Sequence, residues 1–330
     1  MNLSSPNFEQ ASANRPLAAI TGATGFIGRH TVDALTQAGW RVRLLLRRDP
    51  SGSAWRASRP EVVAGSLNDE AALERLVDGA DAVIHLAGLI KAARRAEFFE
   101  VNRNGAARLA EVVRRRAPDA RFVMVSSLAA REPSLSDYTA SKQAGESAVR
   151  DVLGNRATVL RPPAVYGPGD RETLRFFQVA AWRRIPLMGG PDARVALIHV
   201  RDLARLIAVL AAAPPVGQVM TAADNHLEGY SWSRLLGAAA HAIGNPEPRF
   251  VQAPQSLLRG VALIGDLARL GGSASMLNTQ KLRELRHADW AVAPGELARQ
   301  PGWAPEFDID SGFADAVAWY RAAGWLPQAR

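Results

Sequence analysis

The chain has 330 residues, 48% of them hydrophobic and 22% charged, and a formal net charge of +8. This length and composition predict a folded globular protein with a principal domain and a second lobe, and they exclude a largely disordered chain. Because cysteine is absent, disulfides, thiolate nucleophiles and cysteine-ligated metals are excluded, and no metal site is expected.

The N-terminal segment has neither the basic start nor the apolar core of a secretory signal. Residues 1–14 are therefore predicted to be a flexible tail, and the protein is expected to be cytoplasmic. The positive charge allows an acidic ligand, a nucleic-acid surface or a solvated arginine-rich face. The basic run Arg114–Arg116 fits the last turn of a helix, where cations complement the helix dipole. Nucleic acid is therefore not expected as a partner.

Short apolar runs alternate with helix-length amphipathic segments from Leu17 onward, which is typical of a parallel sheet covered on both faces. Strands are predicted at Leu17–Thr21, Arg41–Leu46, Glu61–Val63, Ala82–His85, Arg121–Ser126 and Ala157–Leu160. Helices are predicted over Phe26–Ala38 and Tyr138–Leu153, and each is followed by a glycine where a left-handed residue ends a helix. The predicted fold class is α/β, with a Rossmann-type doubly wound parallel sheet.

After Asp170 the sequence pattern changes to that of irregular loops and scattered helices. Sheet-like sequence returns at Val195–His199 and Gly217–Thr221. We assign residues 15–169, with returning segments at about 195–222, to the Rossmann domain. Residues 170–194 and 223–330 are assigned to a smaller, mostly C-terminal lobe that binds the substrate. The final helix, Phe313–Ala323, carries an apolar face and is expected to pack onto the body; that face consists of Phe313, Ala316, Val317 and Tyr320.

The segment Ser256–Gly272 carries its charges, Arg259, Asp266 and Arg269, along one narrow stripe, and apolar residues cover the rest. It is too short and too charged to span a bilayer, so no membrane span is expected. We interpret it as a buried or substrate-covering helix, with a membrane-surface helix as the alternative. If it covers the site, the substrate is partly apolar.

Gly22, Gly25 and Gly28 follow the first predicted strand and lead into the first predicted helix. Glycine permits positive φ in a tight turn, and it lets backbone N–H groups approach a phosphate at a helix N-terminus. This context predicts a turn that binds a dinucleotide, and the alternative is a strand-to-helix turn without a ligand.

With its leading threonine, the stretch Thr21–Gly28 (TGATGFIG) resembles the extended branch of the short-chain dehydrogenase/reductase superfamily, the NAD(P)-dependent epimerase/dehydratase family. The resemblance covers nearly the whole chain. It recurs at His85–Gly88, Phe98–Leu109, Val125–Ser127, Tyr138–Lys142, Leu160–Asp170, Ile198–Ile207 and Pro301–Pro305. It implies an NAD(P) cofactor whose contacts include Gly22, Thr24, Gly25, Phe26, Ile27, Gly28, Leu86, Ala87 and Gly88.

Tyr138 and Lys142 stand four residues apart at the start of a predicted helix, so their side chains share a face. A cation beside a tyrosine lowers the pKa of the phenol toward the working range, which makes Tyr138 a candidate general acid/base. The resemblance implies that Ser127 is the catalytic serine, with Ser126 as the alternative, because strand alternation lets only one of them face the cofactor.

The resemblance also implies that Lys142 hydrogen-bonds the nicotinamide ribose. Asn102 would then be a structural or proton-relay residue behind the site, and its alternative is an amide that packs helices together. Only eleven positions separate Ser127 from Tyr138, a shorter connection than in the sugar-nucleotide members. This shortness counts against a nucleotide-sugar substrate.

Pro162, Pro163 and Val165 follow the strand that ends near Leu160, and the resemblance places this turn against the nicotinamide. Proline supplies a rigid wall without a hydrogen-bond donor, and its alternative is an ordinary loop. Arg194 resembles a phosphate-binding arginine of sugar-nucleotide enzymes, with a surface arginine as the alternative.

An NAD site needs a carboxylate at the end of the second strand. This chain has Arg47 and Arg48 there, with no acidic residue between Asp33 and Asp49. A guanidinium suits a 2′-phosphate, so NADP(H) is favoured over NAD(H), with Arg47 as the first choice. Arg48 is the second choice and Arg29 the third; the alternative is a pair of solvated arginines beside an unselective site.

The adenine side departs from the family, whose members usually carry an aspartate after the glycine at Gly65. This chain has Ser66 and Leu67 there. A hydroxyl contacts the adenine amino group more weakly than a carboxylate does.

We therefore predict an NADP-dependent oxidoreductase that transfers hydride between the nicotinamide and a carbonyl or secondary alcohol of a small molecule. Tyr138 would exchange the proton with that substrate. One alternative is a nucleotide-sugar epimerase or dehydratase that retains its NAD(P), and another is a non-catalytic NADP-binding scaffold or redox sensor. The sequence leaves the substrate's identity, the direction of the reaction and formation of a homodimer open.

Overall fold

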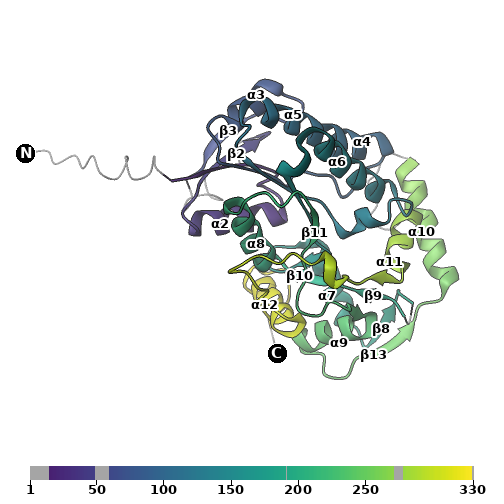
Figure 1. The fold of residues 1–330 in the computed structure, drawn as a ribbon. Helices are drawn as coiled ribbons and strands as arrows, with labels where there is room; N and C mark the ends of the chain where they lie inside the picture. The colour runs from purple at the N-terminus through teal and green to yellow at the C-terminus, as the bar shows by residue number, and fades with distance from the viewer. Residues whose placement is uncertain (1–14, 49–58, 191, 271–277, 329–330) are drawn as a thin grey trace, which may run out of the picture.

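The computed structural model of the chain describes residues 15–48, 59–190, 192–270 and 278–328. Its main feature is a seven-stranded parallel sheet in the order β11-β6-β5-β4-β1-β2-β3 (Figure 1). The strands are β1 (Leu17–Thr21), β2 (Arg41–Leu46), β3 (Glu61–Ala64), β4 (Ala82–His85), β5 (Arg121–Val125), β6 (Ala157–Arg161) and β11 (Val219–Thr221). This strand order is that of a doubly wound Rossmann sheet, so the predicted fold class is confirmed.

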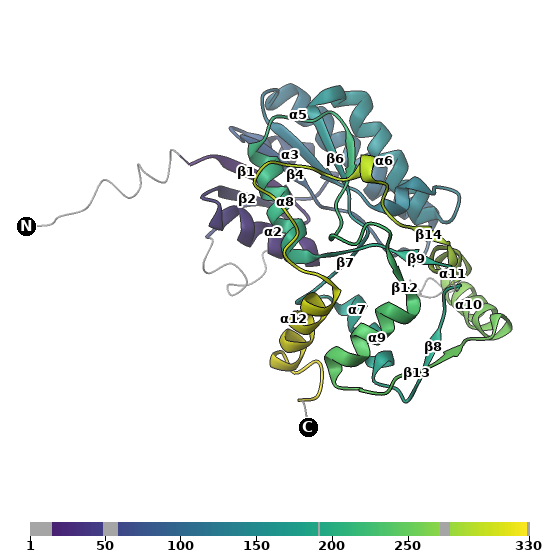
Figure 2. The ribbon, with the colours of Figure 1, turned by 60° about the horizontal axis from the view of Figure 1, so that its bottom comes forward.

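Helices cover both faces of the sheet, because residues that alternate along each strand are apolar on both sides. Ile20 of β1 packs in the core beneath α2 (Phe26–Gln37) and α8 (Val200–Ala212). Its neighbour Ala19 packs in the opposite core; the helices there are α3 (Glu70–Val77), α5 (Ala106–Arg116) and α6 (Asp137–Leu153). Figure 2 shows both layers, which leave the carboxyl ends of the strands along one edge.

The predicted strand at Val195–His199 does not join this sheet. It divides into β9 (Arg194–Val195), which pairs with β12 (Tyr230–Ser231) and β14 (Asp289–Trp290), and β10 (Leu197–His199), which pairs with β7 (Ala164–Tyr166). The physical reason is that β11 pairs with β6 and so fills the edge of the main sheet. Of the two returning segments, only β11 extends the parallel sheet.

A second hydrophobic core lies in the smaller lobe. Several aromatic rings pack in it, among them Phe177 and Phe313, which are packed edge to face at 5.1 Å between ring centroids. The elements around it are α7 (Arg171–Ala180), β8 (Arg184–Leu187), α9 (Trp232–Ile243), β13 (Arg249–Gln252) and α12 (Ile309–Ala322). The predicted apolar face of the last helix is buried in this core against α9, so the final helix packs as predicted.

The buried carboxylate of Asp202 ties the C-terminal segment to α8. It accepts hydrogen bonds from the backbone N–H groups of Glu306 and Phe307 at 3.1 and 3.0 Å. The indole of Trp303 donates to the Asp202 carbonyl at 3.0 Å. Two of the sequence motifs, Ile198–Ile207 and Pro301–Pro305, are therefore joined by one aspartate.

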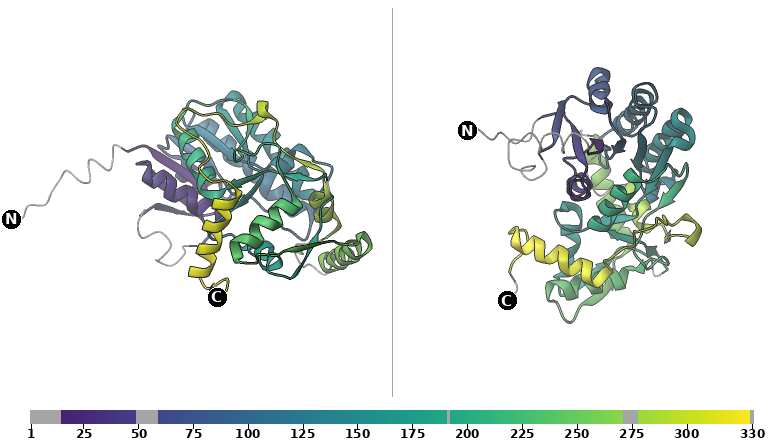
Figure 3. Two further views of the ribbon diagram at one scale, coloured as in Figure 1. Left: turned by 90° about the horizontal axis from the view of Figure 1, so that it is seen from below. Right: turned by 60° about the vertical axis from the view of Figure 1, so that its left-hand side comes forward.

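The helices α10 (Gln255–Leu270) and α11 (Thr279–Arg286) form the outer edge of the lobe (Figures 1 and 3). The interpretation of Ser256–Gly272 as a buried or substrate-covering helix was wrong. Leu258 and Ala262 are buried, but Leu257, Leu263 and Ile264 are exposed, because α10 packs mainly on α11 alone. Within the described residues, no helix is both long and apolar enough to cross a membrane.

The glycine turn after β1 predicts a difference between two alanine substitutions. Gly22 and Gly39 both have positive φ, +78° and +87°, but a Cβ on Gly22 would lie 2.5 Å from the Ala87 nitrogen, whereas a Cβ on Gly39 would meet nothing within 4 Å. We expect Gly39→Ala to lower the free energy of unfolding by about 1 kcal/mol and Gly22→Ala to lower it by about 3 kcal/mol or more. Urea unfolding measures both, and equal losses would contradict the close approach at Gly22.

Candidate active site

The turn that follows β1 forms a cradle of backbone groups at the carboxyl edge of the sheet. The N–H of Gly25 donates to the Gly22 carbonyl at 3.0 Å. A Cβ on Gly28 would lie 2.2 Å from that same carbonyl oxygen, so the chain can follow this path only with glycine at position 28. Gly25 is the N-cap of α2, no side chain caps this helix, and its first turn holds no acidic residue. The first N–H groups of α2 are therefore left for an external acceptor.

Several other helices of the protein, in contrast, start with a side-chain cap. Side chains cap α3, α6, α7, α9, α11 and α12; the capping residues are Asp69, Ser136, Asp170, Ser231, Asn278 and Asp308. A helix N-terminus with unused donors and no Cβ atoms in front of it binds phosphate well. The cradle therefore fits the pyrophosphate of a dinucleotide, with Thr24, Phe26 and Ile27 at its rim.

The other residues expected to contact the cofactor lie after neighbouring strands of the same sheet. They are Arg47 and Arg48 after β2, Ser66 and Leu67 after β3, and Leu86, Ala87 and Gly88 after β4. Because the strands are parallel, all these loops meet at one edge, beside the cradle. Arg47 and Arg48 are exposed. Arg29 is held at the turn itself, since its Nε donates to the Thr24 carbonyl at 3.3 Å.

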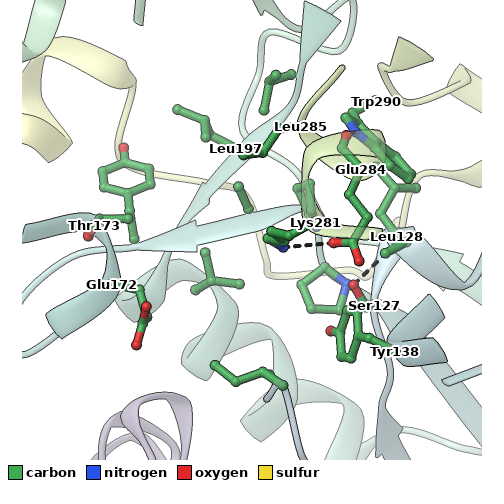
Figure 4. Close-up of a pocket in the computed structure, with 18 of the residues that line it drawn as sticks. Ser127, Leu128, Tyr138, Glu172, Thr173, Leu197, Lys281, Glu284, Leu285 and Trp290 are labelled. Carbon is green, nitrogen blue, oxygen red and sulfur yellow. Dashed lines mark hydrogen bonds and ion pairs between the residues drawn. The ribbon is translucent and has the colours of Figure 1, made fainter. Parts of the chain in front are cut away.

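Ser127 and Tyr138 lie together in the wall of a cavity (Figure 4). Ser127 follows β5, and Tyr138 stands in the first turn of α6, where Ser136 and Thr139 form a capping box that fixes the start of the helix. The hydroxyl of Ser127 lies close enough to Tyr138 to lower the pKa of the phenol. Ser126 is instead buried, and its hydroxyl donates to Glu146. The geometry therefore favours Ser127 over Ser126 as the partner of the tyrosine.

The ionisation of Tyr138 differs from what the sequence indicated. Burial raises the pKa of Tyr138 to about 12, and the nearby charge of Glu284 adds to this rise, while the hydrogen bond with Ser127 lowers it. The expected lowering by Lys142 is not seen, because the ammonium group of Lys142 donates to the Val125 carbonyl and makes no contribution to the pKa of Tyr138. In this structure Tyr138 is a protonated phenol at neutral pH, which is the form that donates a proton.

Lys142 is buried below the site, and its Nζ donates to the Val125 carbonyl at 3.1 Å. Burial lowers the pKa of Lys142 to about 8, although the carboxylate of Glu146 opposes the shift. His85, at the end of β4, is also buried, and burial together with the charge of Lys142 lowers the pKa of His85 to about 3. This imidazole is therefore neutral, with its Nδ1 2.7 Å from the Thr21 hydroxyl.

Asn102 lies behind the site on η1 (Glu100–Gly105), a π-helical segment between α4 (Arg95–Phe99) and α5. Its Nδ2 donates to the Leu89 carbonyl at 3.0 Å and to the Ser141 hydroxyl at 2.9 Å, and its Oδ1 accepts from the Leu89 N–H at 2.7 Å. The loop after β4 is thereby fastened to α6. These bonds make Asn102 a residue that positions the loop and the helix relative to each other.

The cavity beside Ser127 and Tyr138 has a volume of about 530 Å³ and lies between the sheet edge and the lobe. Most of the side chains that line it are apolar. They include Phe26, Ile27, Ile90, Phe98, Leu128, Pro162, Pro163, Val165, Leu197, Leu235, Leu285 and Trp290. The turn predicted to face the nicotinamide therefore forms one wall of this cavity.

The charged groups in the cavity are largely paired. Lys91 binds Glu172 at 2.5 Å, and Lys281 binds Glu284 at 2.7 Å. With Asp170, the described lining residues hold three carboxylates against these two ammonium groups. A nucleoside diphosphate carries its own negative charges, so this balance opposes its binding.

Arg194 does not supply the missing positive charge. Its side chain is exposed, and its guanidinium donates to the Ala193 carbonyl at 3.2 Å. The neighbouring Val195 and Ala196, in contrast, do line the cavity. This position agrees with the surface alternative for Arg194.

The sequence did not indicate the wall formed by α11 and β14. Glu284 extends from α11 toward Ser127 and Tyr138, with Lys281 beside it (Figure 4). The indole of Trp290 donates to the Glu284 carbonyl at 2.9 Å and fixes this helix end. The only signal was the spacing of Lys281 and Glu284 by three positions, which is common on exposed helices.

Comparisons with known proteins show the family and the fold of the chain. Residues 18–222 match the sequence profile of the NAD dependent epimerase/dehydratase family. A ceramide reductase of Caulobacter vibrioides is 46% identical over 319 residues, covering 96% of this chain and 98% of that protein. Sterol demethylase protein B of Methylococcus capsulatus is 26% identical over 341 residues, covering 93% and 99%. The crystal structure of gox2253 shares the fold, with a TM-score of 0.73 and 21% identity over 95% of this chain and all of that one.

Glu284 gives a direct test of the electrostatics at Tyr138. Glu284→Gln removes a negative charge that raises the pKa of the phenol, so we expect the pKa of Tyr138 to fall in this variant. Ring-carbon NMR of labelled tyrosine measures the pKa, with Tyr138→Phe to assign the signal. Glu172→Gln, in the opposite wall, is the matched control and should leave the pKa unchanged. An unchanged pKa in Glu284→Gln would contradict the arrangement.

Proposed function

The chain belongs to the NAD dependent epimerase/dehydratase family and is an NAD(P)-dependent oxidoreductase, and we propose that it uses NADPH to reduce a carbonyl group of an amphiphilic, ceramide-like lipid. The observation that carries this proposal is the apolar cavity of about 530 Å³ with Ser127 and Tyr138 in its wall. A cavity of this size and lining suits an apolar organic ligand with few polar groups. The ceramide reductase that is 46% identical over nearly the whole chain supports the same substrate class.

In the proposed reaction Tyr138 gives its proton to the carbonyl oxygen, and the hydroxyl of Ser127 donates a hydrogen bond to that oxygen. The bound nicotinamide supplies the hydride. Burial, with a smaller contribution from Glu284, raises the pKa of Tyr138, and a protonated phenol suits reduction rather than oxidation. Lys142 holds the nicotinamide ribose; its Nζ is 3.7 Å from where a Cβ on Gly88 would stand, close to the loop expected to contact the cofactor.

The preference for NADPH is supported by Arg47 and Arg48, which are exposed at the carboxyl end of β2. A guanidinium at this position can grip a 2′-phosphate with two parallel hydrogen bonds. A bare ribose would find no carboxylate there to accept from its 2′-hydroxyl. We assign the main contact to Arg47.

Two other functions fit the family less well for this chain. A nucleotide-sugar epimerase or dehydratase must hold a diphosphate, and the carboxylates of the cavity oppose that charge. A non-catalytic scaffold or redox sensor has no need of a tyrosine paired with a serine at an apolar cavity. Reduction of a partly apolar ketone uses both features.

Tyr138→Phe tests the proposed proton donor. We expect kcat for NADPH-dependent reduction of a ketone-bearing ceramide analogue to fall by about a hundredfold to ten-thousandfold, because the variant has no proton to give. The Kd for NADPH should be nearly unchanged. Ser127→Ala should also lose activity, while Ser126→Ala should keep more of it. A fully active Tyr138→Phe variant would overturn the assignment.

Arg47→Ala tests the cofactor preference. Losing hydrogen bonds to a charged phosphate should raise the KM for NADPH by about tenfold to a hundredfold and leave the KM for NADH unchanged. Arg48→Ala and Arg29→Ala are the matched comparisons and should have smaller effects. Two results would show that Arg47 does not bind the 2′-phosphate. One is a wild-type enzyme that prefers NADH, and the other is an Arg47→Ala variant that still prefers NADPH as wild type does.

A further inference from the structure

The outer helix α10 presents an apolar face that the fold leaves uncovered. Leu257, Val261 and Ile264 follow one another at helical spacing and are 60%, 42% and 67% exposed, and Leu263 beside them is 57% exposed. Soluble monomers rarely expose so many large apolar side chains together. The helix is held to the protein from its other side, where Leu258 and Ala262 are buried with Leu282 of α11.

Arginines border this apolar face. Arg259 of α10 and Arg283 and Arg286 of α11 line a shallow groove between the two helices, together with the apolar side chains of Leu263 and Leu282. An exposed row of leucine and isoleucine flanked by arginine is the pattern of helices that lie in the plane of a membrane surface. The arginines complement the negative headgroups of anionic lipids.

The same helix pair adjoins the candidate active site. Gln280, Lys281, Glu284 and Leu285 on one side of α11 line the cavity, while Leu282, Arg283 and Arg286 line the groove beside α10. α11 therefore lies between α10 and the cavity. Figure 1 shows α10 on the outside of the molecule, with α11 between it and the body.

We propose that α10 and the bordering arginines bind the surface of an anionic lipid bilayer, with the helix lying in the membrane plane. A second copy of the chain suits this face less well, because a two-fold contact would place the bordering arginines of both copies in one interface. The proposal goes beyond the reduction proposed above. It depends on the surface alone, so it can be tested without a substrate.

Vesicle sedimentation tests the proposal on the full chain. We expect wild-type protein to bind vesicles of phosphatidylglycerol and phosphatidylcholine in equal parts, and to bind pure phosphatidylcholine weakly. Leu257→Glu with Ile264→Glu should weaken binding to the anionic vesicles about tenfold or more, and so should Arg283→Glu with Arg286→Glu. Val62→Glu is the matched control, since Val62 is 45% exposed on β3, far from α10, and this change should leave binding unaltered.

Two results would overturn the proposal. One is wild-type protein that does not bind the anionic vesicles. The other is a wild-type protein that is a dimer in light scattering, together with a Leu257→Glu, Ile264→Glu variant that is a monomer but binds vesicles as wild type does. That result would assign the face to a second copy. Melting temperatures equal to wild type establish that the variants are folded. Reductase activity on a detergent-dispersed ketone reports separately on the proposed function.

Discussion

The close approach of the Gly22 backbone to Leu86 and Ala87 is the contact on which the rest of the site depends. A Cβ at Gly22 would lie 2.5 Å from the Ala87 nitrogen, so the turn after β1 and the loop after β4 form one edge without a gap. Asn102 extends this edge by fastening Leu89 to α6 through three hydrogen bonds. Because α6 also carries Tyr138, this tyrosine and the glycine turn are positioned by one continuous set of short contacts.

Burial shifts three titratable groups at this site toward their neutral forms. It raises the pKa of Tyr138 and lowers the pKa values of Lys142 and His85. The charge of Glu284 adds to the rise in the pKa of Tyr138, and its side chain lines a largely apolar cavity. Such a site suits a substrate that brings little charge of its own, and it opposes polyanionic substrates.

The sequence predicted the parts of the fold that local patterns determine. Continuous apolar runs identified β1 and β4, which are buried on both faces, and Gly22 marked a turn that only glycine can make. It could not predict which neighbours cover an amphipathic helix, so α10 was taken as covered although its apolar face is exposed. The wall formed by α11 was missed for the same reason, since the spacing of Lys281 and Glu284 does not show what lies opposite. The direction of the Tyr138 pKa shift depends on burial and on Glu284, and neither can be read from residues 138–142.

We propose that hydride leaves NADPH and stays in a lipid alcohol. Turnover of a ketone-bearing ceramide analogue with NADPH deuterated at the transferable position of nicotinamide C4, followed by mass spectrometry of the lipid, tests this most directly. The account predicts that the product alcohol gains a single deuterium and that NADPH is consumed in equal amount. Product without deuterium, or turnover without net consumption of added NADPH, would contradict it.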